Sequence, residues 1–233
     1  MWLRSNKART VRTLAIGDVH GCCGALTCLL GAVRPGAGDL VVFLGDYIDR
    51  GPDSRGVIEL LLHLQTVCAT VFLRGNHEAM ILQARDDPTK SNYWQSYGGF
   101  QTLLSYGASF RNDWAAVIPE PHWAFLERTV RFFETPKHIF VHAGLAADLD
   151  LTGQPDWLLY WAPFDASQPH KSGKRVICGH TPQPAGQLKD LGFAVCIDTA
   201  AATRGWLTCL EADSGRYWQA NQGGVVRTGR AKR

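Results

Sequence analysis

The chain has 233 residues, of which 45% are hydrophobic, and its formal net charge is +3. This content is sufficient for one α/β domain with a large core, and no Gly/Ser-rich or Pro-rich linker divides the sequence, so we expect a single domain over residues 1–233. The small net charge does not favour nucleic acid as the main partner, and no apolar run approaches the length of a membrane span.

Both ends of the chain are rich in cations, and we expect residues 1–12 and 224–233 to be flexible, solvated tails. Charges interrupt every apolar run before Leu14, so no signal peptide is indicated and a cytoplasmic location is expected. The seven cysteines lack CxxC spacing. That pattern is typical neither of a disulfide framework nor of a zinc ribbon.

Three segments in the N-terminal third share one pattern, in which a short apolar run ends in glycine and polar side chains. They read TLAIGDVHG at 13–21, VFLGDYIDRG at 42–51 and TVFLRGNHE at 70–78. Asp18, Asp46 and Asn76 follow one another at intervals of about 30 residues, the length of a βαβ unit. We therefore expect three parallel strands that bring all three loops to one edge of a sheet, where open α/β sheets bind ligands.

Helices are predicted between these strands. Residues 24–33 have helical apolar spacing, and Asp53 or Ser54 is the expected N-cap of a helix that continues to Leu64. A third helix is expected around residues 80–84, directly after the third strand.

Residues 86–107 form a polar and aromatic insertion that contains Tyr93, Trp94, Tyr97 and Tyr106. Its composition fits a helical cap near the site, and it fits ordinary packing of exposed helices equally well. The same aromatic side chains could stack nucleobases.

The C-terminal half is rich in predicted strands, at 138–141, 175–178, 195–199, 206–211 and 217–220, with one further helix near Glu120. The first two of these strands end in His142 and in Gly179 and His180. A βαβ half followed by a strand-rich half predicts two packed sheets flanked by helices.

Six side chains at strand ends combine carboxylate, imidazole and amide groups: Asp18, His20, Asp46, Asn76, His142 and His180. This mixture suits borderline divalent metals better than calcium, which prefers oxygen ligands. We expect two ions, manganese first, with iron or zinc as alternatives. Asp46 lies in the middle segment and is the natural bridge. Two such ions clamp an in-line displacement and lower the pKa of a shared water, so that hydroxide attacks.

A hydrolase acting on phosphate also needs a proton donor and phosphate contacts. His77 can be the acid, with Asp49 orienting its ring. Arg50 offers two donors to phosphate oxygens, and Asn76 can contact the substrate as well as a metal. Any one of these residues alone could be structural. Four histidines, each near glycine at a strand end, favour a site.

The motifs GDVHG, GDYIDRG, RGNHE, VHAG and GHT, in this order, closely resemble the calcineurin-like metallophosphoesterases, specifically the PPP-type serine/threonine protein phosphatases and their bacterial relatives. The resemblance extends from Asp18 to His180, and IDT at 197–199 is similar to the end of that family. It implies a four-layer αββα sandwich with a dinuclear site. By resemblance, one metal is bound by Asp18, His20 and Asp46, and the other by Asp46, Asn76, His142 and His180. Asp49 and His77 would be the acid pair, Arg50 would hold phosphate, and Glu78 would support the loop.

One departure from the family stands out. Many bacterial members carry a phosphate-binding arginine in a segment resembling LLWIR, whereas residues 158–164 here read LLYWAPF, with Ala162 near the expected place. The second phosphate contact is therefore missing, shifted or supplied by another residue. The candidates are Arg111, Lys171, Lys174 and Arg204.

The expected function is hydrolysis of phosphoserine and phosphothreonine in proteins, with phosphotyrosine as a further substrate. The alternative is a symmetrical bis(5'-nucleosyl)-tetraphosphatase, because that bacterial branch resembles this chain in all five motifs. A binding module without catalysis is disfavoured, since every metal-ligand position is intact. The expected partner is a phosphoprotein or a small phosphorylated substrate.

Overall fold

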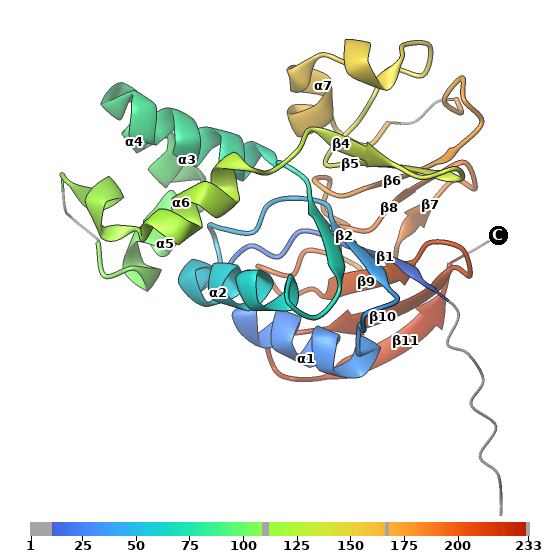
Figure 1. Ribbon diagram of the computed structural model, residues 1–233, viewed down its shortest axis with the longest axis horizontal. Coiled ribbons are helices and arrows are strands. Elements are labelled where there is room, and N and C mark those ends of the chain that lie inside the picture. The colour runs from blue at the N-terminus through green and yellow to red at the C-terminus, as the bar shows by residue number, and fades with distance from the viewer. Residues whose placement is uncertain (1–10, 109–111, 166–167, 232–233) are drawn as a thin grey trace, which may run out of the picture.

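The computed structural model describes residues 11–108, 112–165 and 168–231, which form two β-sheets that pack against each other with helices outside (Figure 1). This arrangement confirms the predicted sandwich of two mixed sheets flanked by helices. Among the helices that the structure describes, none combines the length and hydrophobicity needed to cross a bilayer.

The first sheet has six strands in the order β11-β10-β9-β1-β2-β3. Its strands are β1 (Thr13–Ile16), β2 (Leu40–Phe43), β3 (Ala69–Phe72), β9 (Leu207–Glu211), β10 (Arg216–Ala220) and β11 (Val226–Arg230). β1, β2 and β3 run parallel, as predicted, while β9 pairs antiparallel with β1. The loops after β1, β2 and β3 therefore lie at the same edge of the sheet.

The second sheet has five strands in the order β4-β5-β6-β8-β7. Its strands are β4 (Phe132–Glu134), β5 (His138–Val141), β6 (Arg175–Cys178), β7 (Lys189–Asp190) and β8 (Ala194–Cys196). β5, β6 and β8 are parallel, whereas β4 and β7 pair antiparallel at the two edges. The sequence did not predict β4 or β7, because strands of three and two residues are too short to show a periodic pattern.

The helices are α1 (Cys23–Val33), α2 (Ser54–Leu64), α3 (Asn76–Asp86), α4 (Ser91–Trp94), α5 (Phe100–Ser105), α6 (Glu120–Glu127) and α7 (Asp156–Trp161). Shorter helical turns are η1 (Pro88–Lys90), η2 (Gln95–Gly99), η3 (Trp114–Val117) and η4 (Leu151–Gly153). Asp53 is the N-cap of α2, since its side chain accepts a hydrogen bond from the Gly56 amide at 2.8 Å. α7 was not predicted and covers the second sheet (Figure 1).

Three clusters of buried apolar side chains fill the spaces between the layers of the sandwich. In β2, Val41 and Phe43 belong to the cluster beneath the N-terminal helices, while Val42 belongs to the cluster between the two sheets. In β5, Phe140 joins the middle cluster, and Ile139 belongs to a third cluster beneath α7. Because alternate side chains point to opposite faces, a strand buried on both faces reads as a continuous apolar run.

The prediction of a flexible C-terminal tail over residues 224–233 is wrong for the part that the structure describes, residues 224–231. β11 pairs with β10 from Val226 to Arg230, and Arg227 donates a hydrogen bond to Gln219 at 2.7 Å. Most of β11 is exposed, and charged side chains are common on such an edge strand, so its composition resembles that of a solvated tail. At the N-terminus, Arg12 forms a 2.6 Å ion pair with buried Asp39. The flexible tail predicted for residues 1–12 therefore does not include Arg12. Residues 1–10 lie outside the described part of the chain.

Candidate active site

The predicted site residues converge where the parallel strands of the two sheets end. Asp18 and His20 follow β1, Asp46 follows β2, Asn76 begins α3, and the two remaining histidines, His142 and His180, follow β5 and β6. His180 is half-buried, whereas the other five of these side chains are almost fully buried. The structure therefore brings all six predicted metal ligands together.

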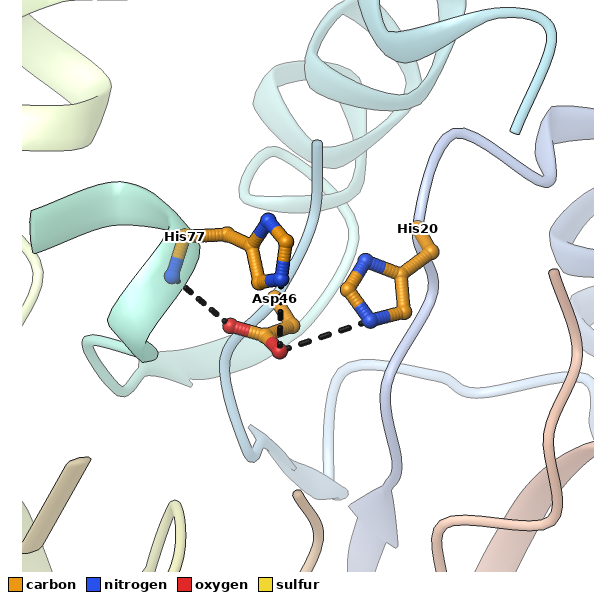
Figure 2. Close-up of side chains that lie close together, drawn as sticks. All are labelled: His20, Asp46 and His77. Carbon is orange, nitrogen blue, oxygen red and sulfur yellow. Dashed lines mark hydrogen bonds and ion pairs between the residues drawn. The ribbon is translucent and has the colours of Figure 1, made fainter. Parts of the chain in front are cut away.

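One cluster contains His20, Asp46 and His77, whose ligand-type atoms all lie within 4.8 Å of one another (Figure 2). Asp46 Oδ2 lies 3.4 Å from His20 Nε2 and 4.0 Å from His77 Nε2. The Asp46 Oδ1 atom accepts a hydrogen bond from the His77 backbone amide at 3.2 Å. The geometry alone would allow His77 as a metal ligand as well as an acid.

A second cluster contains Asp46, His142 and His180. His142 Nε2 lies 3.5 Å from Asp46 Oδ1 and 3.2 Å from His180 Nδ1. The Asn76 Oδ1 atom is 3.0 Å from His142 Nε2 and 3.1 Å from His180 Nδ1. Asp46 is the carboxylate common to both clusters, as its predicted bridging role requires.

Backbone carbonyls fix which ring nitrogen of each histidine faces the centre. The Nδ1 of His20 lies 2.9 Å from the Ile48 oxygen, and the Nδ1 of His142 lies 2.8 Å from the Leu44 oxygen. In His180 it is the Nε2 that lies 3.2 Å from a backbone oxygen, that of Trp161. Because a carbonyl can only accept, each of these nitrogens carries the proton, and the other nitrogen presents a lone pair to the cluster.

Three buried carboxylates lie close together at this point: Asp18, Asp46 and Asp198. The negative charge of Asp198 disfavours the ionisation of the other two. Burial and the neighbouring carboxylates raise the pKa of Asp18 well above its usual value, and burial and Glu78 do the same for the pKa of Asp46. Buried negative charge and convergent lone pairs both require a compensating cation. This donor set of oxygen and imidazole nitrogen fits divalent transition metals.

The backbone is strained where these side chains enter the site. Four site residues of the first half have a positive φ, namely His20 at 45°, Asp46 at 54°, Asp49 at 71° and Arg50 at 66°, and His180 has 63°. Residues other than glycine rarely adopt this region, and strain of this kind is concentrated at functional sites.

Glu78 connects two of the loops. Its fully buried carboxylate accepts hydrogen bonds from the backbone amides of Asp46 and Tyr47, both at 2.8 Å, and of Gly75 at 2.9 Å. Burial raises the pKa of Glu78 to about 7, although the three amides oppose this effect. Glu78 therefore supports the loops after β2 and β3, in the role that the sequence predicts.

His77 and Asp49 form a fully buried pair, with His77 Nδ1 at 2.6 Å from Asp49 Oδ2. The other ring nitrogen, Nε2, is directed toward Asp46 and has no hydrogen-bond partner in the described part of the chain (Figure 2). A buried polar atom without a partner is costly unless a ligand or substrate group meets it. This arrangement suits a proton donor oriented by a carboxylate.

Arg50 is exposed at the edge of the site, with its Nη1 donating to His20 Nε2 at 3.0 Å. Burial lowers the pKa of His77, and the positive charge of Arg50 adds to this effect. The same charge opposes the raised pKa of Asp46. An exposed guanidinium beside a buried carboxylate cluster is well placed to meet an incoming anion.

Of the four candidates for the second phosphate contact, two form ion pairs with carboxylates that are not among the predicted site residues. Lys171 pairs with Asp150 at 2.7 Å, and Lys174 pairs with Glu134 at 2.5 Å. Arg204 is exposed in the loop before β9, and Arg111 lies outside the described residues. Ala162 follows α7 next to Trp161, whose carbonyl contacts His180, so the substituted position does lie beside the site.

Sequence reasoning did not assign four residues that contact or face the site: Ser54, Trp94, Thr102 and Asp198. Asp198 follows an apolar strand, and that signal could have identified it. Trp94 and Thr102 are far from Asp49 in sequence and contact it only in the folded chain.

The calcineurin-like phosphoesterase family model matches residues 11–199, which is most of the chain. The chain belongs to this family. The predicted family is thereby confirmed.

Relatives within this family differ in their activities. Serine/threonine-protein phosphatase 1 of Salmonella typhimurium is 42% identical over 85 residues, which cover 36% of this chain and 37% of that protein. The symmetrical bis(5'-nucleosyl)-tetraphosphatase of Bordetella pertussis is 32% identical over 142 residues, covering 58% and 44% of the two chains. The asymmetrical bis(5'-nucleosyl)-tetraphosphatase PrpE of Oceanobacillus iheyensis is 39% identical over 193 residues, covering 72% and 76%. The first two matches span less than half of those relatives.

Solved structures share the fold at low sequence identity. A candidate diadenosine tetraphosphatase superposes with a TM-score of 0.63 at 22% identity, covering 97% of this chain and 96% of that one. A cold-active protein-tyrosine phosphatase of a Shewanella species gives 0.65 at 17% identity, covering 94% and 80%.

Proposed function

We propose that the protein is a metal-dependent phosphoprotein phosphatase that hydrolyses phosphoserine and phosphothreonine monoesters, with phosphotyrosine as a further substrate. The observation that carries the proposal is the buried His77–Asp49 pair with its unpartnered Nε2. An alkoxide is a poor leaving group and needs a proton as its bond to phosphorus breaks. A nucleotide phosphate released from a phosphoanhydride leaves more easily and has less need of an acid.

In this proposal one ion is held by Asp18, His20 and Asp46, and the other by Asp46, Asn76, His142 and His180. Two divalent ions, manganese in the first instance, would supply charge for the phosphoryl oxygens and would lower the pKa of a bound water. Arg50 and Asn76 bind phosphoryl oxygens and orient the substrate. His77 Nε2 donates its proton to the leaving oxygen, and Asp49 keeps the ring in place.

A second candidate is a bis(5'-nucleosyl)-tetraphosphatase. Two observations favour it: relatives with that name match more of this chain than the Salmonella phosphatase does, and Tyr93 and Tyr97 present exposed rings 4.8 Å apart. Exposed aromatic rings can stack nucleobases. Cleavage could be symmetrical, as expected from the sequence, or asymmetrical, as in the relative with the longest match.

The decisive experiment is to load the protein with manganese and compare kcat/KM on a phosphoserine peptide, diadenosine tetraphosphate and an aryl phosphate. The proposal expects the peptide to be preferred to the dinucleotide. A preference for the dinucleotide would favour the second candidate, and the products would give the cleavage position, since two ADP mean symmetrical cleavage and ATP with AMP means asymmetrical cleavage. Asp46→Asn is the control for contaminating hydrolases. The cytoplasmic location stays a prediction.

A further inference from the structure

The aromatic insertion contains a segment, residues 91–105, that packs directly against the acid pair. This segment, here called the cap segment, comprises α4, η2 and α5. Trp94 is completely buried, and its indole Nε1 donates to Asp49 Oδ2 at 2.9 Å. Thr102 is also completely buried, and its hydroxyl donates to Asp49 Oδ1 at 2.6 Å.

The directions of these hydrogen bonds follow from the groups involved. An indole N–H can only donate, so Asp49 Oδ2 must accept from Trp94. The Thr102 oxygen already accepts from the Asp49 backbone amide at 2.9 Å, and Ser54 Oγ lies 2.9 Å away. The single hydroxyl proton of Thr102 is therefore directed at the carboxylate. With His77 as the third donor, every hydrogen bond at the Asp49 carboxylate favours the ionised acceptor.

The same segment also fixes the residue after Asp49. The Gly98 carbonyl accepts from the Arg50 amide at 3.0 Å. Gly98 has a φ of 110°, and a Cβ atom there would lie 2.7 Å from Arg50 Cγ. Only glycine permits this close approach. The cap segment thus contacts Asp49 and Arg50, two of the three residues that the proposed function uses on the loop after β2.

We propose that Trp94 and Thr102 are positioning residues for the proposed hydrolysis, which hold Asp49 as an ionised acceptor and thereby keep His77 Nε2 directed at the leaving oxygen. The inference rests on the proposed function of the site. It gives the insertion a role in proton transfer, whereas its composition fits a helical cap near the site, ordinary packing or base stacking.

A purely structural role for these residues predicts a different outcome. Trp94 also packs against Trp114, with ring centroids 4.9 Å apart, so its loss could disturb the core alone. Such damage would slow all substrates alike. Loss of acid assistance would instead slow a substrate with an alkyl leaving group much more than one with an aryl leaving group, because a phenolate leaves with little help.

The test uses three variants of these two residues and one control. Thr102→Val removes the hydroxyl at nearly constant volume, Thr102→Ser retains it, and Trp94→Phe removes the indole N–H. Trp114→Phe is the matched control, because it changes a tryptophan of the same buried cluster that does not contact Asp49. We measure kcat and KM on a phosphoserine peptide and on an aryl phosphate, together with the metal content.

Thr102→Val and Trp94→Phe should lower kcat on the peptide by about 10- to 100-fold, the usual effect of losing a supporting hydrogen bond at a site. Their loss on the aryl phosphate should be only a few-fold, with KM and metal content unchanged. Thr102→Ser should retain most activity, and Trp114→Phe should slow both substrates equally or not at all. Equal losses on the two substrates for Thr102→Val would overturn the proposal.

A double variant tests whether the effect passes through His77. In a His77→Asn background, Thr102→Val should cause no further selective loss, because the group that it positions is absent. An undiminished selective loss in this background would contradict the proposal.

A readout without turnover separates this inference from the proposed function. In the metal-free protein, the Trp94 indole proton should exchange slowly with solvent, and Asp49→Asn should shift its NMR resonance. A rapidly exchanging indole proton, unaffected by Asp49→Asn, would refute the contact itself. A wild-type protein that ignores both phosphate esters but shows the protected indole would count against the proposed function while leaving this contact intact.

Discussion

The two halves of the molecule contribute to the site in different ways. The loops after β1, β2 and β3 supply carboxylates, the acid pair and the arginine, and they are held by dense side-chain contacts such as those of Glu78. The loops after β5 and β6 supply only His142 and His180. One of these histidines is oriented by the Leu44 carbonyl of the first half.

This difference separates two kinds of function. Strained backbone and buried hydrogen bonds are concentrated in the first half, where groups must keep a fixed orientation for chemistry. The second half presents the imidazole nitrogens of His142 and His180 and the buried carboxylate of Asp198. We therefore expect changes to the acid pair of the first half to alter proton transfer, and changes to His142 and His180 of the second half to alter metal content.

Asp46→Asn should have the largest effect, because Asp46 is the one carboxylate common to both clusters. We expect both ions to be lost and turnover to fall by roughly 10³-fold or more, since metal ions stabilise the transition state by several kcal/mol. Metal analysis and kcat check this. Asp39→Asn, a buried carboxylate at the far end of β2 that pairs with Arg12, is the control and should keep both ions. Two tightly held ions in Asp46→Asn would contradict the bridging role.

His77→Asn and His180→Asn should separate the two halves. If His77 is the acid, its loss should keep both ions and cost about 10²- to 10⁴-fold on phosphoserine, with a much smaller loss on an aryl phosphate. His180→Asn should lose metal and slow both substrates alike. Metal content and kcat on the two leaving groups distinguish these outcomes. Metal loss with equal slowing for His77→Asn would make His77 a ligand, as its place in the first cluster also allows.

Glu78→Gln should destabilise the metal-free protein by about 3 kcal/mol. The glutamine NH₂ group would face backbone amides that also donate, which leaves at least one buried donor unpaired. Urea unfolding measures this change. Glu59→Gln, which breaks an exposed pair with Arg55, should change the free energy of unfolding by less than about 1 kcal/mol. Similar values for the two variants would show that Glu78 does not hold the loops together.

The pH dependence of stability should report on Asp49. Burial raises the pKa of Asp49 to about 7, against the hydrogen bonds from Thr102 and Trp94. The folded state therefore binds this proton more tightly than the unfolded chain, and the stabilisation is complete below about pH 4 and lost as the pH rises to about 7.

The raised pKa values of Asp18, Asp46, Glu78 and Asp198 add to this pH effect, and the lowered pKa of His77 acts in the opposite direction. Urea unfolding of the metal-free protein at pH 5 and pH 7.5 measures it. Asp49→Asn should reduce this pH difference by the part that Asp49 contributes. An unchanged difference in that variant would assign the effect to other groups.

Ala162→Arg should have the smallest effect and concerns the second half. Ala162 follows Trp161, whose carbonyl contacts His180, so a longer side chain at this position starts beside the site. A restored phosphate contact should lower KM for a phosphate ester by about 10-fold, the value of one charge-assisted hydrogen bond. Steady-state kinetics with unchanged metal content checks the result, and Ala162→Gln controls for size. An unchanged KM would place the family's arginine elsewhere in the chain.

Local patterns in the sequence predicted the long central strands and the ligand set. Strands buried on both faces read as apolar runs, and glycine with metal-type side chains marks their ends, so local sequence was enough to place Asp18, Asp46, Asn76 and His142 at strand ends on one side of the molecule. The edge strands β4, β7 and β11 lack such a pattern, because β4 and β7 are very short and the five residues of β11 are mostly exposed. Pairing with a neighbouring strand stabilises them more than their own composition does.

The tertiary structure alone decided which side chains support the site. Trp94 and Thr102 lie 45 and 53 residues after Asp49, and their contacts with it depend on how the cap segment packs against the loop after β2. Aromatic composition could not show this, since an indole packed in a core and one that donates to a buried carboxylate look the same in sequence. The sequence therefore determined the residue types of the proposed metal ligands and their order, because these are local. The orientation of the acid pair was decided by long-range packing, because a hydrogen-bond partner is chosen by proximity in space.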